Sequence, residues 1–275
     1  MARALCDKLR EILKATIVVE NRAGATTAIG TEHVAQSAPD GLTLLFASPP
    51  GFTIVPHLRR VKYTLEQFEP VGAIGNVATM IVTRQDLPVE TLADFISLAK
   101  KSPGKLTFGF PGVGSLGHMA GEVFVRQAGI EVLNVPHKGS ADTIAAALGG
   151  HVDFICNDAV VAHVNSGRLK ALAAFADRPL ASLPQVPTMR QAGFTAPIPL
   201  TPMGVLAPNG TPRAIVEKLT AAIQQAMSDP SFTDRLSQFS VVAQWQPPEE
   251  FLRLLVQGRD AFGAVIREKG IKDTG

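Results

Sequence analysis

The feature that most constrains the fold is a short-period alternation of apolar strands and helices in the middle of the chain. Strand patterns at residues 105–110, 131–136, 151–157 and 169–176 alternate with helical patterns at 116–129, 140–148 and 159–165. Strands joined through helices usually lie parallel in one sheet that helices cover on both faces. We therefore expect a doubly wound α/β domain with a mostly parallel sheet.

The flanking sequence predicts a second domain of the same kind. Strand patterns at 16–21 and 42–48 enclose a helical pattern at 27–37, and long helical patterns occur at 211–229 and 249–270. The long helices need a sheet to pack against, and we assign them to the N-terminal half. The expected fold is α/β, two doubly wound lobes with a hinge: domain 1 comprises residues 1–80 and 206–275, and domain 2 residues 81–205.

Composition and charge exclude several classes of function. The net charge is only +2, and the basic residues form no stripe that would bind nucleic acid or an anionic membrane surface. Cys6 and Cys156 lie far apart in the sequence, which argues against a disulfide framework or a zinc site, and Cys156 is expected in the core. The histidines show no metal-ligand spacing. We expect neither a metal site nor a cofactor.

A glycine-rich turn follows the strand pattern at 105–110. Gly112, Gly114 and Gly117 spell G-x-G-x-x-G, which is typical of dinucleotide-binding loops. That function requires an acid at the end of the next strand, whereas Glu131 lies at the beginning of that strand. Two interpretations remain open: the amides at the helix start bind another anion, or the glycines only let helix and strand pack closely.

Two further loops favour the anion site. Lys138, Gly139 and Ser140 join the second strand of domain 2 to its helix, and Asn157 and Asp158 follow the third strand. The carboxyl ends of parallel strands meet at one edge of a sheet, so the three loops are expected to face one crevice. Two roles are open for Asp158: it contacts an ammonium or hydroxyl group of the ligand, or it caps a helix.

Six ordered stretches of the chain resemble one family. They are VVENRAGATTAIGTEHVAQSAPDGLTLLFAS, FGFPGVGSLGHMAGEVF, VPHKGSADTIAAALGGHVDFICND, GRLKALA, LPQVPTMRQAGF and GVLAPNGTP. They closely resemble the Bug family, the extracytoplasmic solute receptors of tripartite tricarboxylate transporters. The resemblance implies a periplasmic binding protein-like (type II) fold without catalysis. It also implies capture of an amino acid, a di- or tricarboxylate or an aromatic acid in an interdomain cleft.

The resemblance also implies that amides and small hydroxyls of the strand-to-helix loops hold the carboxylate. The expected partners are the small carboxylate and membrane transporter subunits; the receptor is expected to be a periplasmic monomer that neither binds nucleic acid nor inserts into the membrane. No catalytic residue is expected. Carried onto this sequence, the ligand-binding residues are Thr26, Thr27, Ser48, Gly112, Val113, Gly114, Ser115, His118, Lys138, Gly139, Ser140, Asn157 and Asp158.

The chain departs from the family pattern at several of these loops. Thr26 and Thr27 stand where the family commonly has glycine, and Pro49 and Pro50 lack amide donors. The identity of the ligand can therefore not be transferred from the family to this chain. The chain opens in a helical pattern at 2–13 where the family has an export signal, a strand and a carboxylate-binding loop. We expect these upstream of Met1, and weak binding without them. An NAD(P)-linked oxidoreductase and a sensor that signals to a partner protein are the alternatives.

Overall fold

The computed structural model describes residues 1–22, 24, 27–196 and 199–272. The chain divides into two compact units. Unit 1 comprises Met1–Val77 and Thr201–Gly263, and unit 2 comprises Ala78–Leu200 and Ala264–Gly275. The boundaries proposed for the two domains, and the hinge between them, stay predictions.

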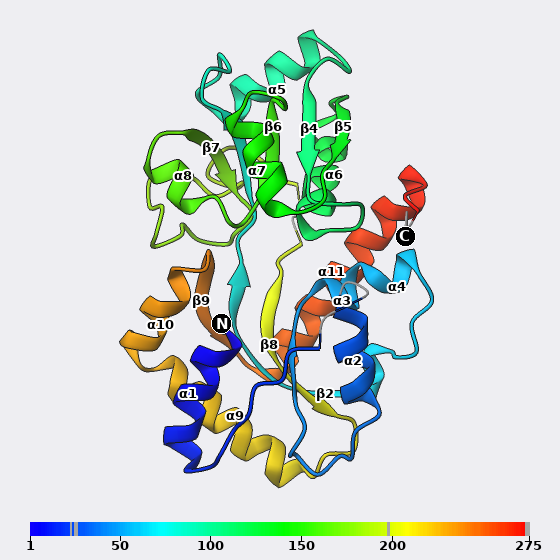
Figure 1. Ribbon diagram of the computed structural model, residues 1–275, viewed down its shortest axis with the longest axis vertical. Helices are drawn as coiled ribbons and strands as arrows, with labels where there is room; N and C mark the ends of the chain where they lie inside the picture. Colours follow the sequence, from blue (N-terminus) through cyan, green and yellow to red (C-terminus); the bar gives the residue numbers. More distant parts are fainter. Residues whose placement is uncertain (23, 25–26, 197–198, 273–275) are drawn as a thin grey trace. The chain divides into compact units, whose positions relative to one another are not determined.

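Unit 1 is built on a four-stranded sheet with the order β1-β8-β2-β9 (Figure 1). The strands are β1 (Leu45–Ala47), β2 (Phe68–Val77), β8 (Pro202–Pro208) and β9 (Val241–Gln246). All neighbouring pairs are antiparallel, so the expectation of a mostly parallel sheet is wrong for this unit. The reason is that β8 enters the sheet from unit 2, without the helical crossover that makes two strands parallel.

Two strand assignments in this unit also differ from expectation. The stretch at 16–21 has no regular structure, because its apolar residues find no sheet to cover: Val18 is 82% exposed. Strand β9, which the sequence does not suggest, pairs with β2 although Gln244 and Gln246 interrupt its apolar pattern.

The helices of unit 1 come from both ends of its sequence. The short ones are α2 (Ala28–Ala35), α3 (Pro50–Thr53), α4 (Val55–Leu58) and the 3-10 helix η2 (Leu65–Gln67). The others are α1 (Ala2–Leu13), α9 (Arg213–Met227), α10 (Pro230–Ser237) and α11 (Pro248–Lys269), whose last turns belong to unit 2. The core includes Phe52, Tyr63, Phe68 and Phe251. None of the helices in the described parts of the chain is long and apolar enough to cross a membrane.

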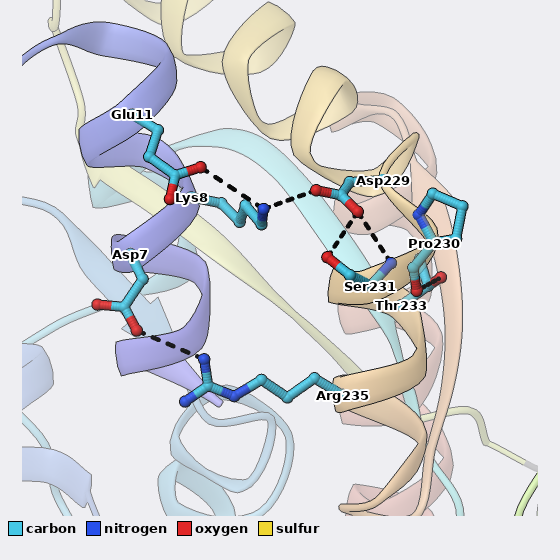
Figure 2. A network of polar contacts seen from close by, with 8 residues as sticks. All are labelled: Asp7, Lys8, Glu11, Asp229, Pro230, Ser231, Thr233 and Arg235. Carbon is cyan, nitrogen blue, oxygen red and sulfur yellow. Dashed lines mark hydrogen bonds and ion pairs between the residues drawn. The ribbon is translucent and has the colours of Figure 1, made fainter.

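A polar network joins α1 to the start of α10 (Figure 2). Helix α1 buries Ala4, Leu5 and Leu9. On its polar side, Lys8 Nζ lies 2.6 Å from Asp229 Oδ2. Asp229 is the N-cap of α10, and the Ser231 amide donates to its Oδ1 at 2.8 Å. One carboxylate therefore ties α1 to α10 and also caps a helix.

The contribution of the Lys8–Asp229 contact to the stability of the fold is expected to be lost in acid. The hydrogen bond from Lys8, followed by those from Ser231, lowers the pKa of Asp229 to about 2. The pKa of an aspartate in the unfolded chain is about 3.9, so the stabilisation is full above about pH 5 and is lost as the pH falls through about 2. We expect Asp229→Asn, which keeps a capping oxygen, to lower the thermal unfolding midpoint at pH 6 and to lower it much less at pH 2. An equal difference at both values would contradict this account.

Unit 2 is built on a five-stranded sheet with the order β5-β4-β6-β3-β7 (Figure 1). The strands are β3 (Met80–Arg84), β4 (Thr107–Phe110), β5 (Leu133–Pro136), β6 (Phe154–Asn157) and β7 (Leu169–Ala174). Strand β4 is parallel to β5 and β6, as the alternation predicts. Strand β3 is antiparallel to β6 and β7, so only part of the sheet has the expected direction.

The helices of unit 2 are α5 (Leu92–Lys101), α6 (Leu116–Ala128), α7 (Ser140–Leu148) and α8 (Val161–Asn165). Phe95, Phe108, Phe124 and Phe154 form the centre of an aromatic core between the sheet and helices α5 and α6. Cys156 belongs to the same core, and burial raises the pKa of its thiol. The prediction that Cys156 is a core residue is confirmed.

Candidate functional site

Three loops of unit 2 lie together at the carboxyl ends of β4, β5 and β6. The turn after β4 leads into α6, the loop after β5 leads into α7, and Asn157 ends β6. A Cβ at Gly112 in the first loop would lie 3.9 Å from the carbonyl oxygen of His137 in the second. Ser140, at the end of the second loop, hydrogen-bonds to Asn157. The structure thus brings together the three predicted loops of this unit.

The three glycines of the G-x-G-x-x-G motif have two different roles. Gly112 and Gly114 have φ values of 84° and 76°, in the left-handed region that favours glycine. Gly117 lies in the first turn of α6, where an added Cβ would stand 2.2 Å from the carbonyl oxygen of Cys156. The third glycine therefore serves close helix-to-strand packing, and the first two shape the turn.

Most amides of this turn bond within the protein. The Gly112 amide donates to Phe110 O at 3.0 Å, and the Ser115 amide donates to Gly112 O at 3.3 Å. The Gly114 amide donates to His118 Nδ1 at 3.1 Å. This corrects the expectation that the amides from Gly112 to Ser115 hold a carboxylate, because three of them already have acceptors. The remaining amide in this stretch is that of Val113, a partly buried residue.

The first turn of α6 supplies the donors that the preceding turn lacks. Ser115 is the N-cap, and its Oγ accepts the His118 amide at 3.1 Å. The amides of Leu116 and Gly117 have no acceptor within the helix because they belong to its first turn. They carry the positive end of the helix dipole, and the Ser115 hydroxyl retains its proton for donation. Together they can bind one carboxylate group.

The start of α7 has a similar arrangement. Gly139 is the N-cap, with extended backbone at φ −177°, and a Cβ there would meet nothing within 4 Å. Ser140 Oγ lies 2.7 Å from Asn157 Nδ2, while Asn157 Oδ1 accepts the Ala159 amide at 2.8 Å. Buried Asn157 therefore orients the Ser140 hydroxyl, which can donate its proton to Asn157 Oδ1 at 3.0 Å or to an anion that replaces this acceptor. Lys138 is exposed beside this helix start and adds positive charge.

Asp158 is half-buried after β6. Burial raises the pKa of its carboxyl above the ordinary value. The N-cap of α8 is Val160, and the first turn of that helix contains no acid. The interpretation of Asp158 as a helix cap is therefore wrong. Its role in reading a ligand stays a prediction.

His118 lies under the turn instead of lining it. It is 3% exposed, its Nδ1 accepts from Gly114, and its Nε2 lies 3.6 Å from Glu122 Oε1. Direct contact between its ring nitrogens and a ligand, as expected from the sequence, is therefore not available. Glu122 is also 3% exposed and accepts a hydrogen bond from Asn134 Nδ2 at 2.5 Å. Sequence reasoning missed Glu122, although an acid four residues after a histidine on an apolar helix face marks such a pair.

Unit 1 contains three of the predicted ligand-binding residues, Thr26, Thr27 and Ser48. Thr26 lies outside the described residues. Ser48 directly follows β1, and its carbonyl accepts the Gly51 amide at 3.1 Å. Thr27 Oγ1 is buried without a hydrogen-bond partner in the described structure, 2.6 Å from where a Cβ at Gly51 would stand. Thr27 thus lies beside α3, the short helix that follows β1.

Thr27 has φ 78°, a conformation that a β-branched residue adopts only under strain. We expect Thr27→Gly to raise the free energy of unfolding by about 1 kcal/mol, because the strain of about 1–2 kcal/mol exceeds the entropic cost of glycine. Urea unfolding of the two proteins measures this difference. Thr27→Ala, which removes the hydroxyl but keeps most of the strain, is the control. A glycine variant less stable than wild type would contradict the strain.

No group of three or more histidine, cysteine, aspartate or glutamate side chains that could hold a metal ion occurs within the described ranges. Two α/β units, with small hydroxyls and helix-start amides at their strand-to-helix loops, are typical of solute-binding receptors of the periplasmic binding-protein class. Residues 1–271 match the family described as "Tripartite tricarboxylate transporter family receptor". The chain belongs to this family.

The comparisons with individual proteins agree with this membership. Protein BugT of Bordetella pertussis is 31% identical, over 99% of this chain and 85% of that protein. The structure of Rpa4515 of R. palustris with adipate has a TM-score of 0.82 and 27% identity, covering 99% of this chain and 92% of that one. The structure of MatC of Rhodopseudomonas palustris with bound malate has a TM-score of 0.77 and 26% identity, covering 96% of this chain and 92% of that one.

Family membership decides several of the expectations. The resemblance to Bug receptors, the fold class and the role of a solute-binding receptor are confirmed. The alternative of an NAD(P)-linked oxidoreductase is wrong, because the family consists of receptors and not of enzymes. Its members are extracytoplasmic and serve tripartite transporters.

Proposed function

We propose that this receptor binds a small organic carboxylate at the α6 and α7 starts of unit 2. The single observation that carries the proposal is the pair of neighbouring helix N-termini, each with a serine, Ser115 and Ser140, at the ends of parallel strands. Such ends attract anions through free amides and the helix dipole. Two related structures, one with adipate and one with bound malate, support a carboxylate ligand.

The other candidate residues complete the proposed site. Lys138 contributes long-range attraction, and Asp158 contacts a polar group of the ligand away from its carboxylate. Thr27 and Ser48 stay predicted hydroxyl donors of unit 1. Val113 contributes its amide. The receptor acts as a monomer in the periplasm and delivers its ligand to membrane subunits of a tripartite transporter. It neither inserts into the membrane nor binds nucleic acid.

Titration calorimetry tests the proposal. We expect malate, adipate or another di- or tricarboxylate to bind with saturable heat, and the corresponding diamide to give none, because it lacks the negative charge. NADH is the control for the nucleotide interpretation of the glycine-rich turn. Binding of NADH together with no response to any carboxylate up to millimolar concentration would overturn the proposal.

A further inference from the structure

The two ring nitrogens of His118 have different partners. Nδ1 accepts the Gly114 amide at 3.1 Å, whereas Nε2 faces the Glu122 carboxylate at 3.6 Å. A ring nitrogen that accepts a hydrogen bond carries no proton, so neutral His118 holds its proton on Nε2. In this tautomer Nδ1 accepts the hydrogen bond from the Gly114 amide, and the protonated Nε2 faces the Glu122 carboxylate.

Glu122 is held in place from two sides. Burial raises the pKa of its carboxyl, but hydrogen bonds from His118 and Asn134 outweigh that effect, and the pKa lies below its ordinary value. The group is therefore ionised at neutral pH. Asn134 of β5, whose Nδ2 donates at 2.5 Å, connects it to the strand that leads into the Lys138 loop.

The surroundings of the pair are otherwise mostly apolar. The Phe110 ring stacks on the imidazole with its centroid 4.0 Å away. In the part of the chain that the structure describes, the other titratable groups acting on the pair are the buried thiol of Cys156 on β6, whose pKa is raised, and Lys269 of α11. Neither replaces the imidazole as an acceptor for the Gly114 amide.

We propose that His118 is a positioning residue that holds the turn before α6 in its ligand-binding form, with Glu122 fixing the ring. The inference rests on the proposed function, since it concerns the same helix start. Nδ1 fixes Gly114, and this sets the path of the chain into Ser115 and the first amides of α6.

Two variants separate positioning from mere packing. In His118→Asn, Oδ1 replaces Nδ1 as an acceptor for the Gly114 amide; in His118→Leu no acceptor remains. We expect affinities for malate or adipate at pH 8 within about threefold of wild type for the asparagine variant and at least about tenfold weaker for leucine, the loss of one buried hydrogen bond. Calorimetry measures both.

Rescue by the acceptor gives a readout that packing would not change. Asparagine and leucine are similar in size and both remove the imidazole, but only the asparagine oxygen can accept from the Gly114 amide. Equal affinities of the two variants would overturn the proposal. If the leucine variant fails to fold, a folded His118→Asn variant that binds malate or adipate at least about tenfold more weakly than wild type would overturn it.

Amide hydrogen exchange at Gly114 tests the contact without a ligand. We expect protection in wild type and His118→Asn, and exchange at least about tenfold faster in His118→Leu. Equal protection in wild type and His118→Leu would overturn the positioning role. If no carboxylate binds to wild type, the proposed function fails while this measurement still decides the role of His118.

Discussion

Gly117→Ala is expected to lower the free energy of unfolding by about 2–4 kcal/mol. In an ordinary helix this change stabilises by up to about 1 kcal/mol, because alanine is the better helix former. Here the new Cβ would stand 2.2 Å from the carbonyl oxygen of Cys156, a backbone atom of β6, which lies inside the sheet between β4 and β3. Helix α6 would have to move away from β6, and overpacking of this kind costs more than the helix gains. Urea unfolding followed by circular dichroism gives the value.

The matched control is Gly139→Ala, a glycine at the start of the other helix. Its backbone is extended, and the added Cβ meets nothing within 4 Å. The expected loss is at most about 1 kcal/mol, since alanine is a poorer N-cap than glycine. If both substitutions cost the same, or if Gly117→Ala is as stable as wild type, the close approach of α6 to β6 is not rigid.

The sequence predicts the architecture of unit 2 better than that of unit 1. Periodicity locates β4, α6 and β6, because each of them buries residues in a continuous core that includes Phe108 and Phe154. It also locates the edge strand β5, although none of the residues of this strand is buried. Hydrophobic periodicity does not predict the direction of the strands in unit 1. This direction depends on where the chain enters the sheet, and β8 enters from the other unit.

The candidate site could be located from the sequence, but its chemistry could not be worked out. The turn after β4 and the start of α7 follow from strand-to-helix switches with glycine and serine. Which amides are already bonded depends on side chains that reach the turn from below, as His118 does at Gly114. The motif also does not distinguish a glycine required by a positive φ, such as Gly112, from one required by close packing, such as Gly117.

Gly139→Val is expected to leave the fold intact and to weaken carboxylate binding by at least about thirtyfold, on the order of 2 kcal/mol. The extended backbone at φ −177° suits a β-branched residue, and the space beside it contains no protein atom within 4 Å of a Cβ. The two added methyl groups would occupy the space through which a carboxylate reaches the first amides of α7 and the Ser140 hydroxyl. Calorimetry with malate and adipate gives the affinity, and thermal unfolding confirms the fold.

Gly139→Ala is the graded control, because it adds a single methyl group at the same position. Its affinity should lie between those of wild type and the valine variant, since the ligand can shift to avoid one methyl but not three carbons. Both variants should unfold within a few degrees of wild type, because the only cost is a poorer N-cap. A valine variant that folds and keeps the wild-type affinity would remove the α7 start from the ligand site. The receptor role, which rests on family membership, would remain.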